Sequence, residues 1–109
     1  CFMMLGQEII NAVENKLNPI FIIINNKKLG TIRMHQERNF PKRIIGTDIL
    51  NPDFIALANA YGIDAYRVTE TAEFGDVFEK AIVSHSATLI ELIIDPNVLG
   101  PALEIGENI

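Results

Sequence analysis

The sequence predicts an α/β fold in three layers, in which a parallel sheet carries helices on both faces. Two apolar runs, residues 19–24 and residues 87–95, the second interrupted by Glu91, are typical of strands that are buried on both sides. Helical periods alternate with the predicted strands, which favours right-handed crossovers and parallel pairing. The first helix has no strand before it, so we expect a sheet that is truncated at its N-terminal side.

The first helix is expected over residues 3–17. Apolar side chains recur there at steps of three or four residues and would share one buried face: Phe2, Leu5, Ile9, Val13 and Leu17. The strand at residues 19–24 follows it. Residues 26–50 show no clean period and contain Pro41 and Gly46, which favours a long loop with one helical turn near residues 32–38.

The helix after this loop has clear boundary signals. Asn51 would cap it, Pro52 would occupy its first position, and Asp53 would meet the positive end of the helix dipole. Gly62 would end the helix in a left-handed conformation. The buried side chains of this helix are expected to be Phe54, Leu57, Ala58 and Tyr61.

A further strand is expected over residues 63–69, and Thr71 would cap the helix that follows it. The inner face of that helix would consist of Phe74, Val77, Phe78, Ala81 and Ile82. From Pro96 the chain is expected to be irregular. We therefore divide it into a partial domain over residues 1–95 and an irregular tail over residues 96–109.

The composition limits the classes of function. The chain has 109 residues, of which 49% are hydrophobic, and its formal net charge is −5, so a folded core is expected and nucleic acid is a poor candidate partner. A single cysteine cannot form an internal disulfide. No apolar run approaches the ~20 residues that span a bilayer, and no signal segment opens the sequence. We expect a cytoplasmic protein without a membrane partner.

Positive charge is concentrated in one segment. Residues 27–43 contain six of the nine Lys and Arg side chains, and Glu37 is the only acid among them. An anionic ligand is conceivable there. A solvated basic loop is the alternative.

Two asparagines, Asn25 and Asn26, follow the first predicted strand. Ligands of parallel α/β sheets bind beyond the carboxyl ends of the strands. A carboxamide there offers a neutral oxygen to a hard cation such as Mg²⁺, which shares its oxygen ligands with substrate phosphates. Asparagines are also common turn formers, so spacing alone leaves both explanations open.

The segment CFMMLGQEIINAVENKLNPIFIIINNKKLGTIR, residues 1–33, resembles the thiamine-diphosphate-binding motif of the acetohydroxyacid synthase and 2-oxo acid decarboxylase superfamily. That motif begins with Gly-Asp-Gly and ends in Asn-Asn some two dozen residues later. Here 24 residues precede Asn25, so Gly-Asp-Gly would lie immediately upstream of Cys1. The resemblance continues through NPDFIALANAYG (residues 51–62) and TLIELIID (residues 88–95), and it covers most of the chain.

The resemblance implies a site for thiamine diphosphate and Mg²⁺. The Asn26 side chain and the Lys28 carbonyl would hold Mg²⁺ together with the aspartate of Gly-Asp-Gly, whereas Asn25 would shape the turn. Backbone N–H groups at Cys1 and Phe2 would face the diphosphate. The cofactor-binding residues that the resemblance implies are Cys1, Phe2, Asn26, Lys28, Gly30 and Thr31.

The implied activity is decarboxylation or carboligation of a 2-oxo acid, as in acetolactate synthases. In this family the activating glutamate lies on a separate pyrimidine-binding domain, usually of a partner subunit, so a homo-oligomer is implied and no catalytic residue is assigned. The 109 residues alone are expected to be inactive. Thr31 and His35 stand where related synthases carry methionine and tryptophan, so the substrate stays open. Glu91, in the middle of a strand, is expected either to have a partner or to face the edge of the sheet.

Two other functions stay open. A non-catalytic α/β module could bind an anionic nucleotide or phosphate, although NNKKLG (residues 25–30) offers a single glycine for a phosphate cradle. A nucleic-acid binder that uses residues 27–43 is the least favoured, because the chain is acidic overall. Phosphate binding without thiamine dependence would favour the first, and a steep salt dependence of RNA or DNA binding would favour the second.

Overall fold

The computed structural model describes residues 1–100 and 103–104. It separates into two units. Unit 1 comprises Cys1–Asn25 and Pro52–Ile93, and unit 2 comprises Asn26–Asn51 and Ile94–Ile109. Unit 1 holds the parallel sheet. Unit 2 holds the segment that follows the first strand, together with the C-terminal segment.

Unit 1 contains a parallel sheet of three strands, β1 (Ile20–Asn25), β2 (Asp64–Val68) and β3 (Thr88–Ile93). Their order is β1-β3-β2, so β3 is the central strand. Leu89 and Ile90, which point to opposite faces of β3, are both fully buried. The predicted strand at residues 87–95 is therefore covered on both faces.

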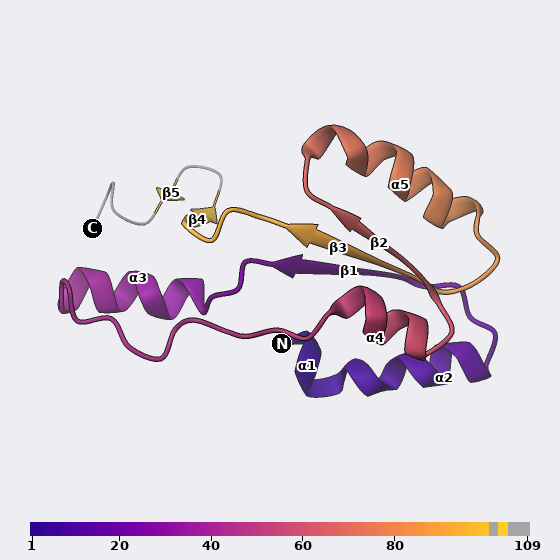
Figure 1. Ribbon diagram of the computed structural model, residues 1–109, viewed down its shortest axis with the longest axis horizontal. Helices are drawn as coiled ribbons and strands as arrows, with labels where there is room; N and C mark the ends of the chain where they lie inside the picture. The colour runs from indigo at the N-terminus through magenta and orange to yellow at the C-terminus, as the bar shows by residue number, and fades with distance from the viewer. Residues whose placement is uncertain (101–102, 105–109) are drawn as a thin grey trace. The chain divides into compact units, whose positions relative to one another are not determined.

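Helices cover both faces of the sheet, as predicted (Figure 1). Helices α1 (Phe2–Leu5), α2 (Ile9–Glu14) and α4 (Phe54–Ala60) lie on one face, and α5 (Thr71–Val83) lies on the other. The buried cluster on the first face consists of Ile9, Ile23, Phe54, Ala58, Ile63, Ala87 and Leu89. The smaller cluster under α5 consists of Val68, Ala81 and Ile90.

The first helical segment is shorter and less regular than predicted. It comprises α1, the 3₁₀ turn η1 (Gly6–Glu8) and α2, instead of one helix over residues 3–17. The predicted inner residues Leu5 and Leu17 are both exposed. The stripe fails because the backbone leaves α-helical geometry at η1 and again at Lys16, whose φ is +55°.

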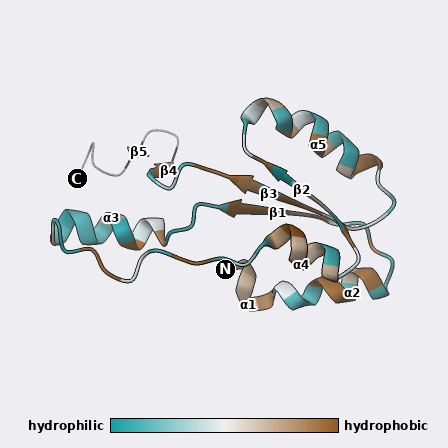
Figure 2. Ribbon diagram, viewed as in Figure 1, coloured by the Kyte–Doolittle hydropathy of each residue, from teal (hydrophilic) through white to brown (hydrophobic). Residues whose placement is uncertain are grey.

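Strand β1 is well covered on one face only, which contradicts the prediction for residues 19–24. On the other face Ile20 is partly buried against the cluster under α5. Ile23 is buried, but Ile22 and Ile24 are 45% and 64% exposed. The reason is that β1 lies at an edge of the described sheet, while α5 packs over β2 and β3. Figure 2 shows the hydrophobic colouring that β1 shares with the central strand β3. Hydrophobicity alone therefore could not show that β1 is an edge strand and β3 the central strand.

Helix α4 begins later than predicted because Asp53, and not Asn51, caps it. One carboxylate oxygen of Asp53 accepts hydrogen bonds from the backbone N–H groups of residues 55 and 56, at 3.0 and 3.2 Å. Pro52 therefore precedes the helix and does not open it. The stop at Gly62 is confirmed by its left-handed φ of +78°.

Helix α5 begins with a capping box one residue before the predicted cap at Thr71. Glu70 is the capping residue, and Thr71 is the first residue of the helix. The Glu73 carboxylate accepts hydrogen bonds from the backbone N–H groups of Thr69 and Glu70, at 3.2 and 3.4 Å. The predicted inner face is confirmed except at Ile82, which is 60% exposed.

Unit 2 contains helix α3 (Gly30–Asn39), where only a turn near residues 32–38 was expected. None of the side chains of α3 is buried, which explains why its sequence has no apolar period. An ion pair between Arg33 and Glu37, one helical turn apart at 2.8 Å, supports it. The Gln36 side chain also exchanges two hydrogen bonds with the Ile45 backbone, at 2.9 and 3.2 Å, so polar contacts and not core packing support this helix.

The C-terminal segment is more regular than expected. Strands β4 (Val98–Gly100) and β5 (Leu103–Glu104) pair in antiparallel fashion, so the prediction of an irregular tail is wrong for these residues. The rest of the tail, residues 101–102 and 105–109, lies outside the described residues. Across the described chain, no helix combines the length and the hydrophobicity that a bilayer crossing requires.

Candidate functional site

The segment that leaves β1 forms a defined turn in unit 2. The carboxamide oxygen of the half-buried Asn26 accepts a hydrogen bond from the Lys28 backbone N–H at 3.2 Å. Lys27, between them, has a left-handed φ of +54°. This side-chain-to-backbone turn gives the Asn26 oxygen a set direction. An oxygen of this kind keeps a second lone pair for another ligand.

A second segment of unit 2 supports the turn. The Leu29 N–H donates to the Thr47 carbonyl at 2.8 Å, and the Ile49 N–H donates to the Lys27 carbonyl at 2.9 Å. These two hydrogen bonds lie on either side of Lys28. Among the described residues, none donates a hydrogen bond to the Lys28 carbonyl itself. That oxygen therefore has the capacity to bind a cation.

The donor atoms around this turn fit a hard cation that brings further ligands of its own. These donors are the oxygens of Asn26 and Lys28. Thr47, whose carbonyl accepts from Leu29, has a buried Oγ1 without a hydrogen-bond partner in the described part of the chain. Residues 1–100 and 103–104 contain no group of three or more His, Cys, Asp or Glu side chains that could hold a metal ion. Neutral oxygens supplemented by phosphate and water suit Mg²⁺.

Gly30 opens α3 at a close approach within unit 2. A Cβ atom at this position would lie 3.1 Å from Leu99 Cδ2 and 3.5 Å from Asn26 Nδ2. The packing of unit 2 therefore already favours glycine here. Thr31 and His35 are both exposed on α3.

Cys1 and Phe2 belong to unit 1, where they form the start of α1. Cys1 is the exposed capping residue, and Phe2 is the first residue of the helix. The Phe2 ring packs edge-on against Phe54, with the ring centroids 5.5 Å apart. It also covers the buried Gly6, where a Cβ atom would lie 2.9 Å from the ring. The beginning of α1 is thereby fixed to α4.

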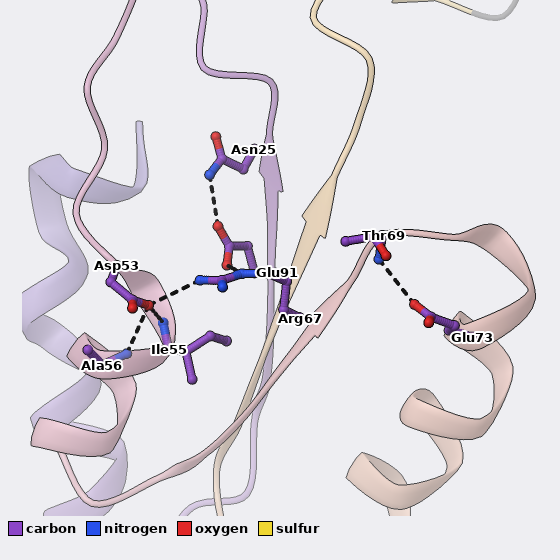
Figure 3. Close-up of polar contacts among 8 residues, drawn as sticks. All are labelled: Asn25, Asp53, Ile55, Ala56, Arg67, Thr69, Glu73 and Glu91. Atoms are coloured by element: carbon purple, nitrogen blue, oxygen red, sulfur yellow. Dashed lines mark hydrogen bonds and ion pairs between the residues drawn. The ribbon is translucent and has the colours of Figure 1, made fainter.

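Four polar side chains form a connected network in unit 1 (Figure 3). Asp53 Oδ1 lies 3.1 Å from Arg67 Nη2, and Arg67 Nε donates to Glu91 Oε2 at 2.8 Å. The Asn25 amide donates to Glu91 Oε1 at 2.8 Å. The expectation that Glu91 has a partner is confirmed. Asn25, which was expected to shape the turn, is instead the buried last residue of β1 and reaches across to β3.

Arg67 and Asp53 were not predicted from the sequence as members of this network. The available signal was the pair of opposite charges at Arg67 and Glu91, each in a predicted strand. In the structure these two residues are direct neighbours in the register of β2 and β3. Strand register cannot be read from the two segments separately, so the pairing stayed hidden.

The network shifts the ionisation of its outer members. The hydrogen bond to Glu91, whose side chain is 3% exposed, is the main cause that raises the pKa of Arg67 above its ordinary value. The backbone N–H of Ala56 is the main cause that lowers the pKa of Asp53, and Arg67 lowers it further. Both groups therefore stay charged at neutral pH.

Replacing Asp53 with asparagine is expected to reduce the acid sensitivity of the fold. Because the pKa of Asp53 is lower in the folded chain than its ordinary value of 3.8, the carboxylate stabilises the fold above that value. This stabilisation is lost as the pH falls through the lowered pKa. Asparagine can also cap a helix but carries no charge. Urea unfolding from about pH 5 to about pH 2 should show a shallower loss of stability in Asp53→Asn.

The matched control for this measurement is Asp76→Asn, which changes an exposed carboxylate on α5. It should leave the pH dependence of the unfolding free energy close to that of the unchanged protein. If the unfolding free energy falls equally steeply with decreasing pH in Asp53→Asn and in the unchanged protein, the Asp53 charge does not stabilise the fold.

Comparison with known proteins places most of the chain in one family. The family model described as "Thiamine pyrophosphate enzyme, C-terminal TPP binding domain" matches residues 1–92. A probable acetolactate synthase large subunit of Methanocaldococcus jannaschii is 29% identical over 96 residues, which are 87% of this chain and 16% of that protein. The acetolactate synthase isozyme 2 large subunit of Escherichia coli is 31% identical over 96 residues, 86% of this chain and 17% of that protein.

Solved structures agree on the fold. Benzoylformate decarboxylase from Polynucleobacter necessarius superposes with a TM-score of 0.78 at 22% identity, over 89% of this chain and 18% of that one. The thiamine diphosphate-dependent 4-hydroxybenzoylformate decarboxylase of Rhodococcus jostii gives a TM-score of 0.71 at 28% identity, over 80% of this chain and 16% of that one. The chain thus spans less than a fifth of the length of these relatives.

Proposed function

Because the chain belongs to the thiamine pyrophosphate enzymes, whose C-terminal TPP-binding domain it matches over residues 1–92, we propose that it is the C-terminal part of a thiamine-diphosphate- and Mg²⁺-dependent enzyme that acts on 2-oxo acids. Its relatives include acetolactate synthases, and its structural neighbours include decarboxylases. We therefore propose decarboxylation or carboligation as the reaction. The observation that carries this proposal is the family match together with the turn at Asn26.

In this proposal the carboxamide oxygen of Asn26 and the carbonyl oxygen of Lys28 bind Mg²⁺, which holds the cofactor diphosphate. Their support is the turn in which the Lys28 N–H orients the Asn26 side chain. Bound thiamine diphosphate would supply the nucleophilic carbon and the electron sink for the reaction of a 2-oxo acid. The residues that we propose to contact the cofactor or its metal are Cys1, Phe2, Asn26, Lys28, Gly30 and Thr31.

We further propose that the pyrimidine end of the cofactor is bound by another domain, of the same or a partner subunit, within a homo-oligomer. No described residue takes the role of the activating glutamate in this proposal. Residues 1–95 would form the cofactor-binding part and residues 96–109 an appended tail. The 109 residues alone would then be inactive. The single cysteine fits an enzyme of the cytoplasm.

Calorimetric titration with thiamine diphosphate and Mg²⁺ tests the proposal. The whole enzyme should bind the cofactor only when Mg²⁺ is present. Asn26→Ala should weaken that binding by at least about 10-fold, because it removes a metal ligand. Asn59→Ala, which changes an exposed asparagine on α4, is the matched control and should bind normally. The isolated 109 residues should give no binding heat.

Two outcomes would contradict the proposal. Normal cofactor binding by Asn26→Ala would remove Asn26 from the metal site. Binding of inorganic phosphate or a nucleotide by the whole protein, without any thiamine dependence, would favour the non-catalytic α/β module and its basic segment at residues 27–43.

A further inference from the structure

A buried polar connection reaches the end of β1 from the middle of the sheet. Glu91 lies on the central strand β3, in register with Ile23 of β1 and Arg67 of β2. Its two carboxylate oxygens have different partners, since Oε2 accepts from Arg67 and Oε1 accepts from the Asn25 amide, each at 2.8 Å. The connection therefore reaches Asn25, the last residue of β1 (Figure 3).

Stability alone does not account for polar side chains at these positions. Asn25 follows Phe21 and Ile23 on the same face of β1, and both of those pack into the apolar cluster. Asn25 and Glu91 are only 5% and 2% exposed. Well-packed apolar side chains are often as stable as a buried charged network, or more stable. The polar pair adds a fixed side-chain orientation, because the hydrogen bond between the Glu91 carboxylate and the Asn25 amide favours one arrangement of the two groups.

We propose that Glu91 is a positioning residue for the metal ligand Asn26. Arg67 holds one oxygen of Glu91, and the other oxygen holds Asn25, so the end of β1 is fixed from the centre of the sheet. Asn26 is the next residue in the chain, so fixing the backbone of Asn25 also fixes the point from which Asn26 begins. Glu91 contacts neither the metal nor the cofactor. The inference rests on the proposed function, because it requires Mg²⁺ at Asn26.

The test is the Mg²⁺ requirement of thiamine diphosphate binding by the whole enzyme, measured by calorimetry. In Glu91→Gln one of the two acceptor oxygens becomes an NH₂ donor, so the side chain can no longer offer a separate oxygen to Asn25 and to Arg67. The Mg²⁺ concentration for half-maximal cofactor binding should rise about 10-fold, as is typical when a residue that supports a metal ligand is changed. The melting temperature of the ligand-free protein is measured in parallel.

Asn25→Ala provides a second test that does not depend on the folding of Glu91→Gln. This change keeps the Arg67–Glu91 ion pair and removes the hydrogen bond between Glu91 and the end of β1. The Mg²⁺ requirement should again rise about 10-fold. Two variants that break the same link at opposite ends should therefore agree.

Glu73→Gln is the matched control for general destabilisation. Glu73 also accepts two hydrogen bonds, but they come from the backbone at the start of α5. Its replacement should lower the melting temperature and leave the Mg²⁺ requirement unchanged. A normal Mg²⁺ requirement in both Glu91→Gln and Asn25→Ala would overturn the inference.

Asn26→Ala separates the failure of this inference from the failure of the proposed function. If Asn26→Ala abolishes Mg²⁺-dependent binding while Glu91→Gln behaves like Glu73→Gln, the proposed function stands and the positioning role is wrong. If the unchanged enzyme binds the cofactor without Mg²⁺, or Asn26→Ala has no effect, the proposed function itself is wrong.

Discussion

Replacing Leu89 with alanine is expected to lower the free energy of unfolding by about 3 kcal/mol. Leu89 lies on the central strand β3, is fully buried, and packs in the cluster formed with Ile9 of α2 and Phe54 of α4. The change removes buried apolar surface and leaves a cavity, since neighbouring strands and helices relax only in part. Domains of this size are stable by about 5–15 kcal/mol, so the loss is a large fraction of the total.

Denaturant unfolding followed by circular dichroism measures this loss, and Ile24→Ala is its matched control. Ile24 is also an aliphatic strand residue, but it lies on the edge strand β1 and is 64% exposed. Its replacement should cost less than about 1 kcal/mol. Equal losses in the two variants would show that β3 is not the buried centre of the sheet, or that another surface covers Ile24.

The contrast between Leu89 and Ile24 shows how far the sequence predicts this fold. Both lie in apolar runs, and both runs correctly predict strands of a parallel sheet. The order β1-β3-β2 depends on long-range pairing that neither run encodes by itself, so the exposure of Ile24 was not predictable. Helix α3 was missed for the opposite reason, because it buries no side chain and so has no apolar period.

In the candidate site, too, the features that depend on neighbouring residues were predictable from the sequence, whereas those that depend on strand pairing were not. Asn26 and Lys28 are expected ligands because of their place in a linear motif, and the turn that joins them depends on residues two apart. Glu91 stood out as the one charged residue of an apolar strand. Its link to Asn25 joins residues that are 66 apart in the chain. Only the sheet register brings these two side chains together.

Replacing Arg67 with leucine is expected to lower the free energy of unfolding by about 3 kcal/mol, at the lower end of the range for a broken buried pair. The Glu91 side chain is 3% exposed and would keep a buried charge without its cation. Arg67 itself is 45% exposed, so water can partly replace it. Arg67→Lys should recover only part of the loss, because Arg67 binds Glu91 and Asp53 through different nitrogens of one planar group.

The double variant Arg67→Leu/Glu91→Leu identifies the source of this loss. If the uncompensated carboxylate is responsible, removing it as well should restore most of the stability, even though one more polar group has gone. A deficit of about 1 kcal/mol should remain, because the Asn25 amide then lacks the acceptor at Glu91. A double variant as unstable as Arg67→Leu would mean that the packing of the Arg67 side chain, and not the charge of Glu91, stabilises this part of the sheet.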